Sequence, residues 1–287
     1  MFIAAETYRA HDFSEYFLER QGRLAAADIS FREAGDGWER FDVALRDDRG
    51  IEIDAILQIP DNIQAATTLL VLAGVRTNRR SIESLEAVGP LVLLFIDYPY
   101  EGKRSKLGAG EFLAAIPRMR RAILDTPAAV TLAVDFLMTR TEVDRSRILL
   151  VGGSFGALIG PAATAFEPRL AGAAFLFGAG DLRTLMAANI PAPGWAAWMG
   201  ASVVSLMTSP VEPTKYIGRI APRPVFILSG RSDERLPESC TRALHDAARE
   251  PKRVRWIEAE HLQIHTDHLR TIVRAEFEAW LIEAGFL

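Results

Sequence analysis

The chain has a single cysteine among its 287 residues, and it has no surplus of positive charge. Cys240 has no second cysteine with which to form an internal disulfide, so nothing in the sequence favours an oxidising compartment. The 33 lysine and arginine residues are outnumbered by 37 acidic residues, which leaves a net charge of −4. Because binding to a polyanion depends on excess basic charge, we expect no nucleic-acid partner.

The sequence also lacks an uninterrupted apolar segment of membrane-spanning length. Residues 148–166 and 189–211 are free of charge, but glycine and proline break both stretches. We predict a buried strand and helix in the first, an apolar flap in the second, and no stable membrane insertion. The apolar start at residues 1–6 is too short for a signal-peptide core, so we expect a cytoplasmic protein.

What is present is the composition of a globular protein, with 49% hydrophobic and 24% charged residues. No internal repeat and no linker rich in serine or proline divides the chain, so we predict one domain over residues 1–287. Residues 182–216 depart from the surrounding pattern because they concentrate proline, tryptophan and methionine. We predict that this segment is a small inserted cap over one end of the domain.

The hydrophobic pattern predicts an α/β protein. Residues 7–27 suggest an amphipathic helix, and alternating residues at 41–45 and 51–57 suggest an antiparallel hairpin. Short continuous apolar runs, typical of strands covered on both faces, then alternate with helical stretches. The runs are 68–72, 91–96, 147–151, 172–177, 225–229 and 253–257, and the helical stretches are 127–140, 155–166, 238–249 and 268–283. We therefore predict a mostly parallel sheet of about eight strands with helices on both faces.

Ser154 lies in the strongest motif of the sequence. Gly152-Gly153-Ser154-Phe155-Gly156 matches Gly-Xaa-Ser-Xaa-Gly and stands between the apolar run 148–151 and a helical stretch. This motif places a serine on a sharp turn between a strand and a helix, where the hydroxyl projects from the edge of the sheet. The segment lacks the Gly-Lys-Ser/Thr of a phosphate-binding loop. We predict that Ser154 is a nucleophile.

A serine nucleophile needs a base and an acid that orients the base. His261 is the best-placed base because it closely follows the run 253–257, and ligands of α/β sheets bind at the carboxyl ends of strands. Asp233 follows the run 225–229 and is the preferred acid, with Asp181 as its competitor. The other histidines downstream of Ser154 are His245, within a predicted helix, and His265 and His268, near the last helix.

With these residues in order, the sequence resembles the α/β-hydrolase-fold serine hydrolases from about residue 39 to the C-terminus. The resemblance rests on the Ser154 motif, on the order Ser154, Asp233, His261, and on the segment Asp97-Tyr98-Pro99-Tyr100-Glu101-Gly102-Lys103-Arg104-Ser105. That segment is similar to the family loop Asp-Xaa-Pro-Gly-Xaa-Gly-Xaa-Ser. Pro222-Arg223-Pro224 is also typical of the family. The long approach to the motif resembles esterases of the dienelactone-hydrolase and acyl-peptidase-like branch.

The resemblance also implies an oxyanion hole made of two backbone N–H groups. One donor is Phe155, the residue after the nucleophile, and the other comes from the loop after the third strand of the family fold. Here that loop reads Ala73-Gly74-Val75-Arg76, where the family commonly has His-Gly. Backbone groups do not depend on side-chain identity, so we expect Val75 to be the second donor, with Arg76 as the alternative.

Two other clusters have competing interpretations. His261, His265 and His268 have a spacing that would place them on one face of a continuous helix, but a loop base explains His261 better, so we predict no metal site. Arg76, Arg79 and Arg80 could clamp a carboxylate, although basic residues in a polar loop are more often only solvated.

The apolar side chains of the predicted cap have two possible roles as well. Trp195, Trp198 and Met199 could line a substrate pocket, seal the cap onto the domain, or do both. We favour contact with substrate.

These observations together predict a carboxylesterase that uses an acyl-enzyme. Its partner is a small-molecule ester, and the mechanism needs no cofactor. A peptidase or thioesterase with the same three residues is the alternative, because acyl transfer differs among them only in the leaving group. A non-catalytic binding protein with the same fold is the third hypothesis. The sequence does not specify an oligomeric state.

Overall fold

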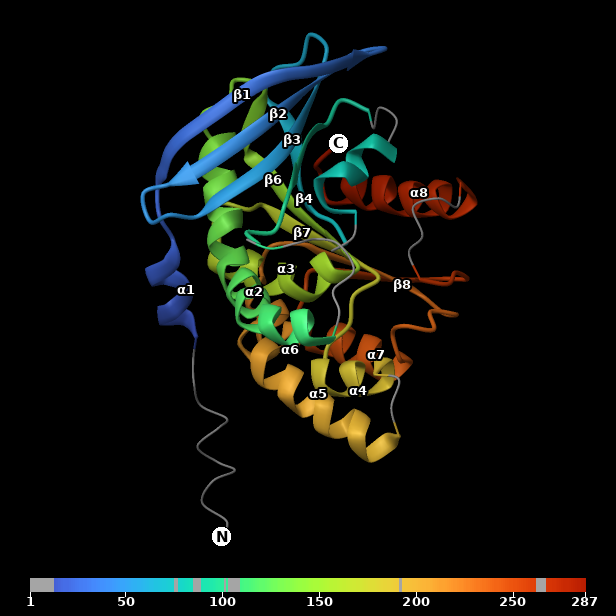
Figure 1. Ribbon diagram of the computed structural model, residues 1–287. Coiled ribbons are helices and arrows are strands. Elements are labelled where there is room, and N and C mark those ends of the chain that lie inside the picture. The colour runs from blue at the N-terminus through green and yellow to red at the C-terminus, as the bar shows by residue number, and fades with distance from the viewer. Residues whose placement is uncertain are drawn as a thin grey trace.

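The computed structural model describes residues 13–74, 77–84, 89–100, 102, 109–190, 193–261 and 267–287. These residues form a nine-stranded sheet with helices around it (Figure 1). The strands are β1 (Leu24–Gly35), β2 (Trp38–Asp47), β3 (Glu52–Pro60), β4 (Ala66–Leu72), β5 (Val92–Ile96), β6 (Val143–Gly153), β7 (Gly172–Leu176), β8 (Val225–Gly230) and β9 (Lys252–Ile257).

The strands lie in the order β1-β2-β3-β5-β4-β6-β7-β8-β9. β1, β2 and β3 are antiparallel to one another, and β3 is antiparallel to β5. All later pairs are parallel, so the carboxyl ends of β4 to β9 meet at one edge of the sheet. The predicted parallel sheet with an antiparallel start is confirmed, with β1 as an additional strand.

Helices pack on both faces of the sheet. The described helices are α1 (Ser14–Arg20), α2 (Ala109–Leu137), α3 (Phe155–Phe166), α4 (Leu182–Asn189), α5 (Gly194–Thr208), α6 (Pro213–Tyr216), α7 (Glu238–Ala247) and α8 (Asp267–Glu283), with short 3₁₀ turns η2 (Asn78–Ser84), η3 (Ser209–Val211) and η4 (Ile217–Arg219). Neighbouring residues of β4 show the two faces. Leu70 packs in the core with α2 and α3, and Leu69 packs in the core with α8. Burial on both faces explains why these strands are continuously apolar.

The N-terminal prediction is wrong beyond Arg20. The helix expected over residues 7–27 is α1, which ends at Arg20, and the chain continues as β1 from Leu24. The alanines that follow Leu24 favour a helix locally, but pairing with β2 holds them in a strand. Residues 7–12 lie outside the described part of the chain.

Five helical segments of the described chain lie between β7 and β8, and the first four fall within residues 182–216, where the cap was predicted. They are α4, α5, η3 and α6, followed by η4 before β8. Figure 1 shows α4 and α5 together at the end of the molecule opposite the β1–β3 strands. Within the described ranges, no helix has both the length and the apolar character needed to cross a membrane.

Candidate active site

Ser154 lies on a strained turn between β6 and α3. β6 ends at Gly153, α3 begins at Phe155, and Ser154 has φ +52° and ψ −111°. A non-glycine residue with positive φ is uncommon and is tolerated where the surrounding structure enforces it. The Ser154 N–H donates to the Leu176 carbonyl at 2.9 Å, which ties the turn to the end of β7. This is the geometry that the glycine-flanked motif predicts.

The two flanking glycines are required by space. A Cβ atom at Gly152 would lie 2.6 Å from the carbonyl oxygen of Gly156, and a Cβ at Gly156 would lie 1.9 Å from the carbonyl oxygen of Leu72. Neither contact is possible for real atoms without a shift of backbone. The glycines therefore let the first turn of α3 press against β6 and against the end of β4.

The structure brings His261 and Asp233 to Ser154. The Ser154 Oγ atom lies 2.8 Å from His261 Nε2, and His261 Nδ1 lies 2.7 Å from Asp233 Oδ2. Asp233 follows β8 and His261 follows β9, so the three residues meet at the carboxyl edge of the sheet. The separations along the chain are 107 residues for Ser154 and His261 and 28 residues for His261 and Asp233.

The Asp233 carboxylate is buried and fully engaged. Its side chain is 2% exposed, and Oδ1 accepts the backbone N–H groups of Arg235 at 2.9 Å and Leu236 at 3.2 Å. These bonds fix the carboxylate, which leaves Oδ2 directed at the imidazole. A carboxylate held in this way orients the ring and stabilises its protonated form.

Phe177 packs against the imidazole of His261, and the sequence analysis did not predict this contact. Its ring meets the His261 ring edge-on, with centroids 6.1 Å apart and planes at 76°. Phe177 is completely buried and has φ +54°. Its N–H donates to the Leu228 carbonyl at 2.7 Å, which ties it to β8. No local signal in the sequence marks Phe177, because its contact with His261 depends on how the ends of two strands meet.

Of the expected oxyanion donors, only Phe155 lies in the described part of the chain. Phe155 is the first residue of α3, and N–H groups in a first helical turn have no acceptor within the helix. The other candidates, Val75 and Arg76, lie outside the described residues. The loop before them is described as far as Gly74, whose carbonyl accepts the N–H groups of Thr77 and Asn78 at 3.1 and 2.8 Å.

The competing histidines and the competing acid lie in other surroundings. His245 is buried with its Nε2 3.0 Å from Ser229 Oγ, His268 is exposed at the start of α8, and His265 lies outside the described residues. Asp181 caps α4, where its Oδ1 accepts the N–H of Thr184 at 3.3 Å. In the described part of the chain, no group of three or more potential ligands is arranged to hold a metal ion.

Two of the three arginines of the loop after β4, Arg79 and Arg80, lie in the described part of the chain, and their surroundings differ. Arg79 pairs with two carboxylates, Asp97 at 3.0 Å and Asp54 at 2.7 Å. Arg80 is exposed, and Arg76 lies outside the described residues. Arg79 therefore has a structural role in joining the loop to β3 and to the end of β5.

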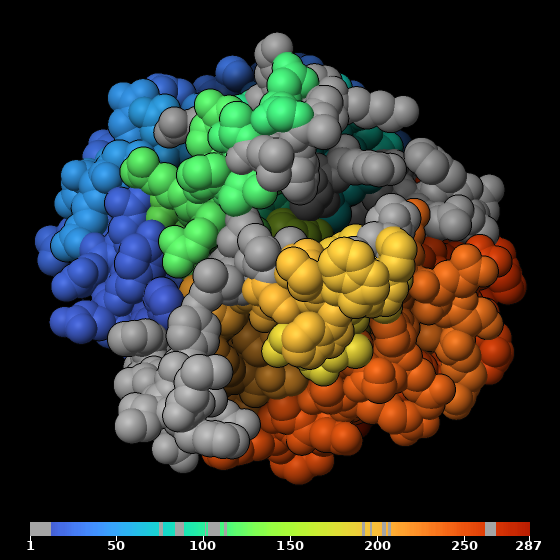
Figure 2. Space-filling view, turned by 60° about the horizontal axis from the view of Figure 1, so that its bottom comes forward, coloured from blue at the N-terminus to red at the C-terminus, as the bar shows by residue number. Residues whose placement is uncertain are grey.

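The three predicted substrate-binding residues share the exposed side of α5. Trp195, Trp198 and Met199 are 72%, 56% and 62% exposed, and their spacing places them on one helical face. The guanidinium of Arg183 stacks 3.5 Å from the centre of the Trp198 ring, which fixes that ring against α4. Figure 2 shows a hollow between the yellow and gold helices α4 and α5 and the green first turns of α2.

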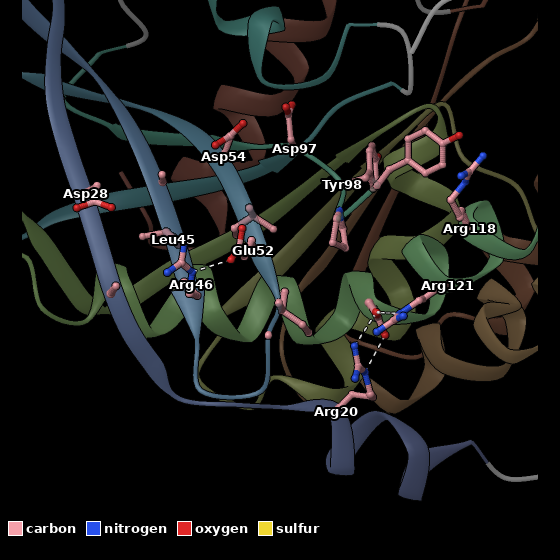
Figure 3. A pocket seen from close by; sticks show the side chains of 18 residues that line it. Arg20, Asp28, Leu45, Arg46, Glu52, Asp54, Asp97, Tyr98, Arg118 and Arg121 are labelled. Atoms are coloured by element: carbon pink, nitrogen blue, oxygen red, sulfur yellow. Dashed lines mark hydrogen bonds and ion pairs between the residues drawn. The ribbon is translucent and has the colours of Figure 1, made fainter. Parts of the chain in front are cut away.

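A separate polar cavity of about 290 Å³ lies beside β1–β3 and α2 (Figure 3). Its walls carry several ion pairs, including Arg46 with Glu52 and Arg20 with Asp125. Ser154, Asp233 and His261 are not among its lining residues. Tyr98 does line it, and the same residue also contacts Phe155 next to the nucleophile.

Solved structures resemble this chain over nearly its whole length. Acetyl xylan esterase from a Paenibacillus species has a TM-score of 0.73 and 19% identity, covering 94% of this chain and 95% of that chain. Acetyl xylan esterase 1 from a Thermoanaerobacterium species has a TM-score of 0.67 and 16% identity, covering 93% of each chain. The alpha/beta hydrolase GrgF from Penicillium has a TM-score of 0.60 and 18% identity, covering 86% and 99%.

The chain has the α/β-hydrolase fold. No protein-family model and no curated protein sequence matches it. At this level of identity the similarity extends to the fold and not to the substrate. In the α/β-hydrolase fold of this chain, the turn after β6 and the loops after β8 and β9 carry the serine, the carboxylate and the imidazole.

Proposed function

We propose that the chain is a serine hydrolase that cleaves carboxylic esters through an acyl-enzyme. The observation that carries the proposal is the hydrogen-bonded series from Ser154 Oγ to His261 Nε2 at 2.8 Å and from His261 Nδ1 to Asp233 Oδ2 at 2.7 Å. An imidazole in this position can take the proton of the hydroxyl as the oxygen attacks a carbonyl. The esterases among the structures of similar fold support ester substrates.

In the proposed first step, Ser154 Oγ forms a bond to the ester carbonyl carbon while its proton moves to His261 Nε2. Asp233 stabilises the resulting imidazolium, and the N–H groups of Phe155 and Val75 receive the negative oxygen. Collapse of the tetrahedral intermediate breaks the bond to the alcohol, which takes the proton from His261. Water then attacks the acyl-enzyme with His261 as base and releases the acid, so the steps use only groups of the chain and water.

We also propose that the segment 182–216 forms a cap and that Trp195, Trp198 and Met199 contact the substrate. Exposed aromatic side chains on one helical face favour this role, because such surfaces commonly bind apolar groups. Replacement of Trp195 by alanine should raise KM for aryl esters without slowing the reaction of Ser154 with a small fluorophosphonate. Unchanged KM across the ester series would remove Trp195 from substrate binding.

A substrate panel tests the choice of reaction. Matched p-nitrophenyl esters, acyl-thioesters and aminoacyl-nitroanilides, assayed with the wild-type chain and with Ser154→Ala, separate the three leaving groups. We expect the esters to give the highest kcat/KM and Ser154→Ala to abolish their turnover. Higher kcat/KM for thioesters or anilides would reassign the activity. Turnover of none of them, together with an unreactive Ser154, would favour a binding protein on the same fold.

A further inference from the structure

Tyr98 joins the two segments that are proposed to form the oxyanion hole. It follows β5, and its hydroxyl donates to the carbonyl of Ala73 at 2.5 Å, at the start of the loop after β4. Its ring meets the Phe155 ring edge-on, with centroids 5.2 Å apart and planes at 74°. One side chain therefore touches the loop after β4 and the residue after the nucleophile.

The hydroxyl of Tyr98 is suited to be a permanent donor. Burial raises its pKa above the usual range for tyrosine, and the neighbouring Asp97 carboxylate acts in the same direction. The hydroxyl consequently stays protonated at physiological pH. The Ala73 carbonyl that accepts its hydrogen bond belongs to a residue that is 6% exposed.

Asp97, the residue before Tyr98, holds the other end of the same loop. Its Oδ1 accepts the backbone N–H of Arg79 at 3.0 Å, and its Oδ2 accepts the Arg79 guanidinium at 3.0 Å. Asp97 is buried at 4% exposure. Two consecutive residues at the end of β5 thus fix the loop at Ala73 and at Arg79.

Between these two points the carbonyl of Gly74 is fixed as well. It accepts the N–H groups of Thr77 and Asn78, and the hydroxyl of Thr77 at 3.3 Å. The described residues of this loop are therefore held by hydrogen bonds at Ala73, at Gly74 and at Arg79.

We propose that Tyr98 is a positioning residue of the oxyanion hole, holding the start of the loop after β4, at Ala73, against Phe155, whose N–H is a proposed donor. The proposal rests on the proposed function. Tyr98 acts through the Ala73 carbonyl and the Phe155 ring and need not touch the substrate. An oxyanion hole works only when its donors are placed in advance, because the charge develops in the transition state. Loss of the hydroxyl should therefore slow the chemical step more than it weakens substrate binding.

The test is Tyr98→Phe, which keeps the ring beside Phe155 and removes only the donor to Ala73. Tyr216→Phe is the matched control, because the buried Tyr216 hydroxyl also donates to a backbone carbonyl, that of Pro210 at 2.7 Å. Each variant is treated with a fluorophosphonate, which forms a bond from phosphorus to Ser154 Oγ, expels fluoride and passes the serine proton to His261. The phosphoryl oxygen of this reagent imitates the oxygen of the ester intermediate, so the reaction needs no natural substrate.

We expect Tyr98→Phe to lower the second-order labelling rate by about 5- to 30-fold, less than removal of a donor itself. For the best ester, kcat per titrated site should fall by a similar factor with KM changed less than twofold. Tyr216→Phe should keep the wild-type labelling rate and kcat per titrated site. Asp97→Asn, which weakens the other end of the loop, should slow labelling in the same direction and provides the test if Tyr98→Phe does not fold.

The outcomes separate the two proposals. If the wild-type chain is labelled at Ser154 and Tyr98→Phe is labelled equally fast, Tyr98 has no positioning role. Equal slowing in Tyr216→Phe would likewise overturn the role, because a general loss of packing would then explain the effect. If the wild-type chain is not labelled at Ser154 at all, the proposed function itself fails.

Discussion

At the residue scale, the two oxygens of Asp233 have separate partners. Oδ1 accepts the N–H groups of Arg235 and Leu236, and Oδ2 faces His261 Nδ1. The two bonds to Oδ1 stabilise the turn after β8, and the bond to Oδ2 orients the imidazole. A substitution that keeps the bonds to Oδ1 and alters the bond to Oδ2 can therefore test catalysis apart from folding.

Asp233→Asn is such a change. The amide oxygen can keep the backbone bonds, but an amide NH₂ facing His261 Nδ1 favours the tautomer in which Nε2 carries the proton and cannot accept one from Ser154. We expect kcat to fall about 10³- to 10⁴-fold with little change in the urea midpoint of unfolding. Asp181→Asn is the control, because Asp181 caps α4, and it should keep kcat. Equal losses of kcat in the two variants would make the assignment of the acid wrong.

The residues of the candidate site were predictable from sequence to different degrees. Ser154 follows from a local motif, and Asp233 and His261 follow from their places after apolar runs, so these three could be named in advance. Tyr98 and Phe177 could not be assigned contacts. Tyr98 reaches back 25 residues to Ala73, and Phe177 meets a histidine on another strand end. Such contacts depend on strand order and on side-chain direction, neither of which is a local property.

At the element scale, the close approach of α3 to β4 determines where the nucleophile stands. The Gly156 position leaves only 1.9 Å between a hypothetical Cβ and the Leu72 carbonyl oxygen. Leu72 is the last residue of β4, directly before Ala73. The same contact therefore sets the distance between the nucleophile turn and the loop held by Tyr98.

Gly156→Ala should push α3 away from β4. Overpacking of this kind costs about 1–3 kcal/mol of the free energy of unfolding, and displacement of Phe155 should lower kcat by about tenfold or more. The matched control is Gly110→Ala in α2, where a Cβ meets nothing within 4 Å, so stability should be unchanged or slightly raised. Urea unfolding and kcat per titrated site check both variants. Wild-type kcat in Gly156→Ala would show that this contact is not needed.

Prediction of the elements failed where long-range pairing or proline decided the outcome. β1 is an edge strand with eleven of its twelve residues exposed, so its sequence shows no buried alternation that would indicate a strand. α2 begins at Ala109, whereas the helical stretch was predicted only over residues 127–140. Pro117 and Pro127 both lie inside α2. The parallel strands, in contrast, are buried on both faces and were predicted to within a few residues.

At the scale of the whole molecule, a buried imidazole away from the candidate site links stability to pH. His245 is 7% exposed, and its ring packs edge-on against Trp256 with centroids 5.0 Å apart. Burial lowers the pKa of His245 to about 4; Asp246 opposes this shift, and Lys252 and Arg242 add to it. The folded chain thus holds the ring neutral at a pH where the unfolded chain protonates it.

The sign of the effect follows from that shift. Above the ordinary pKa of 6.5 both states are neutral at His245, so its contribution to stability is fully present. As the pH falls from 6.5 to about 4, protonation favours the unfolded chain, and up to about 3 kcal/mol is lost. His245→Gln should lose less stability over this interval, and urea unfolding at several pH values measures the difference. Parallel curves for the two chains would contradict the assignment.

The overall architecture was predictable from the sequence. Continuous apolar runs alternating with helical stretches determine a parallel sheet covered on both faces, and the structure confirms this architecture. At its carboxyl edge, the chain brings together groups far apart in sequence to within 2.8 Å. The proposed enzyme depends on that convergence.

Mass spectrometry of a covalent adduct tests this convergence most directly. The wild-type chain, Ser154→Ala and His261→Ala are incubated with a fluorophosphonate, digested and mapped. We predict one phosphonyl group on the peptide that contains Ser154, none on Ser154→Ala, and labelling of His261→Ala slowed by at least about 10³-fold. An adduct on another residue, or equally fast labelling without His261, would contradict the proposed mechanism.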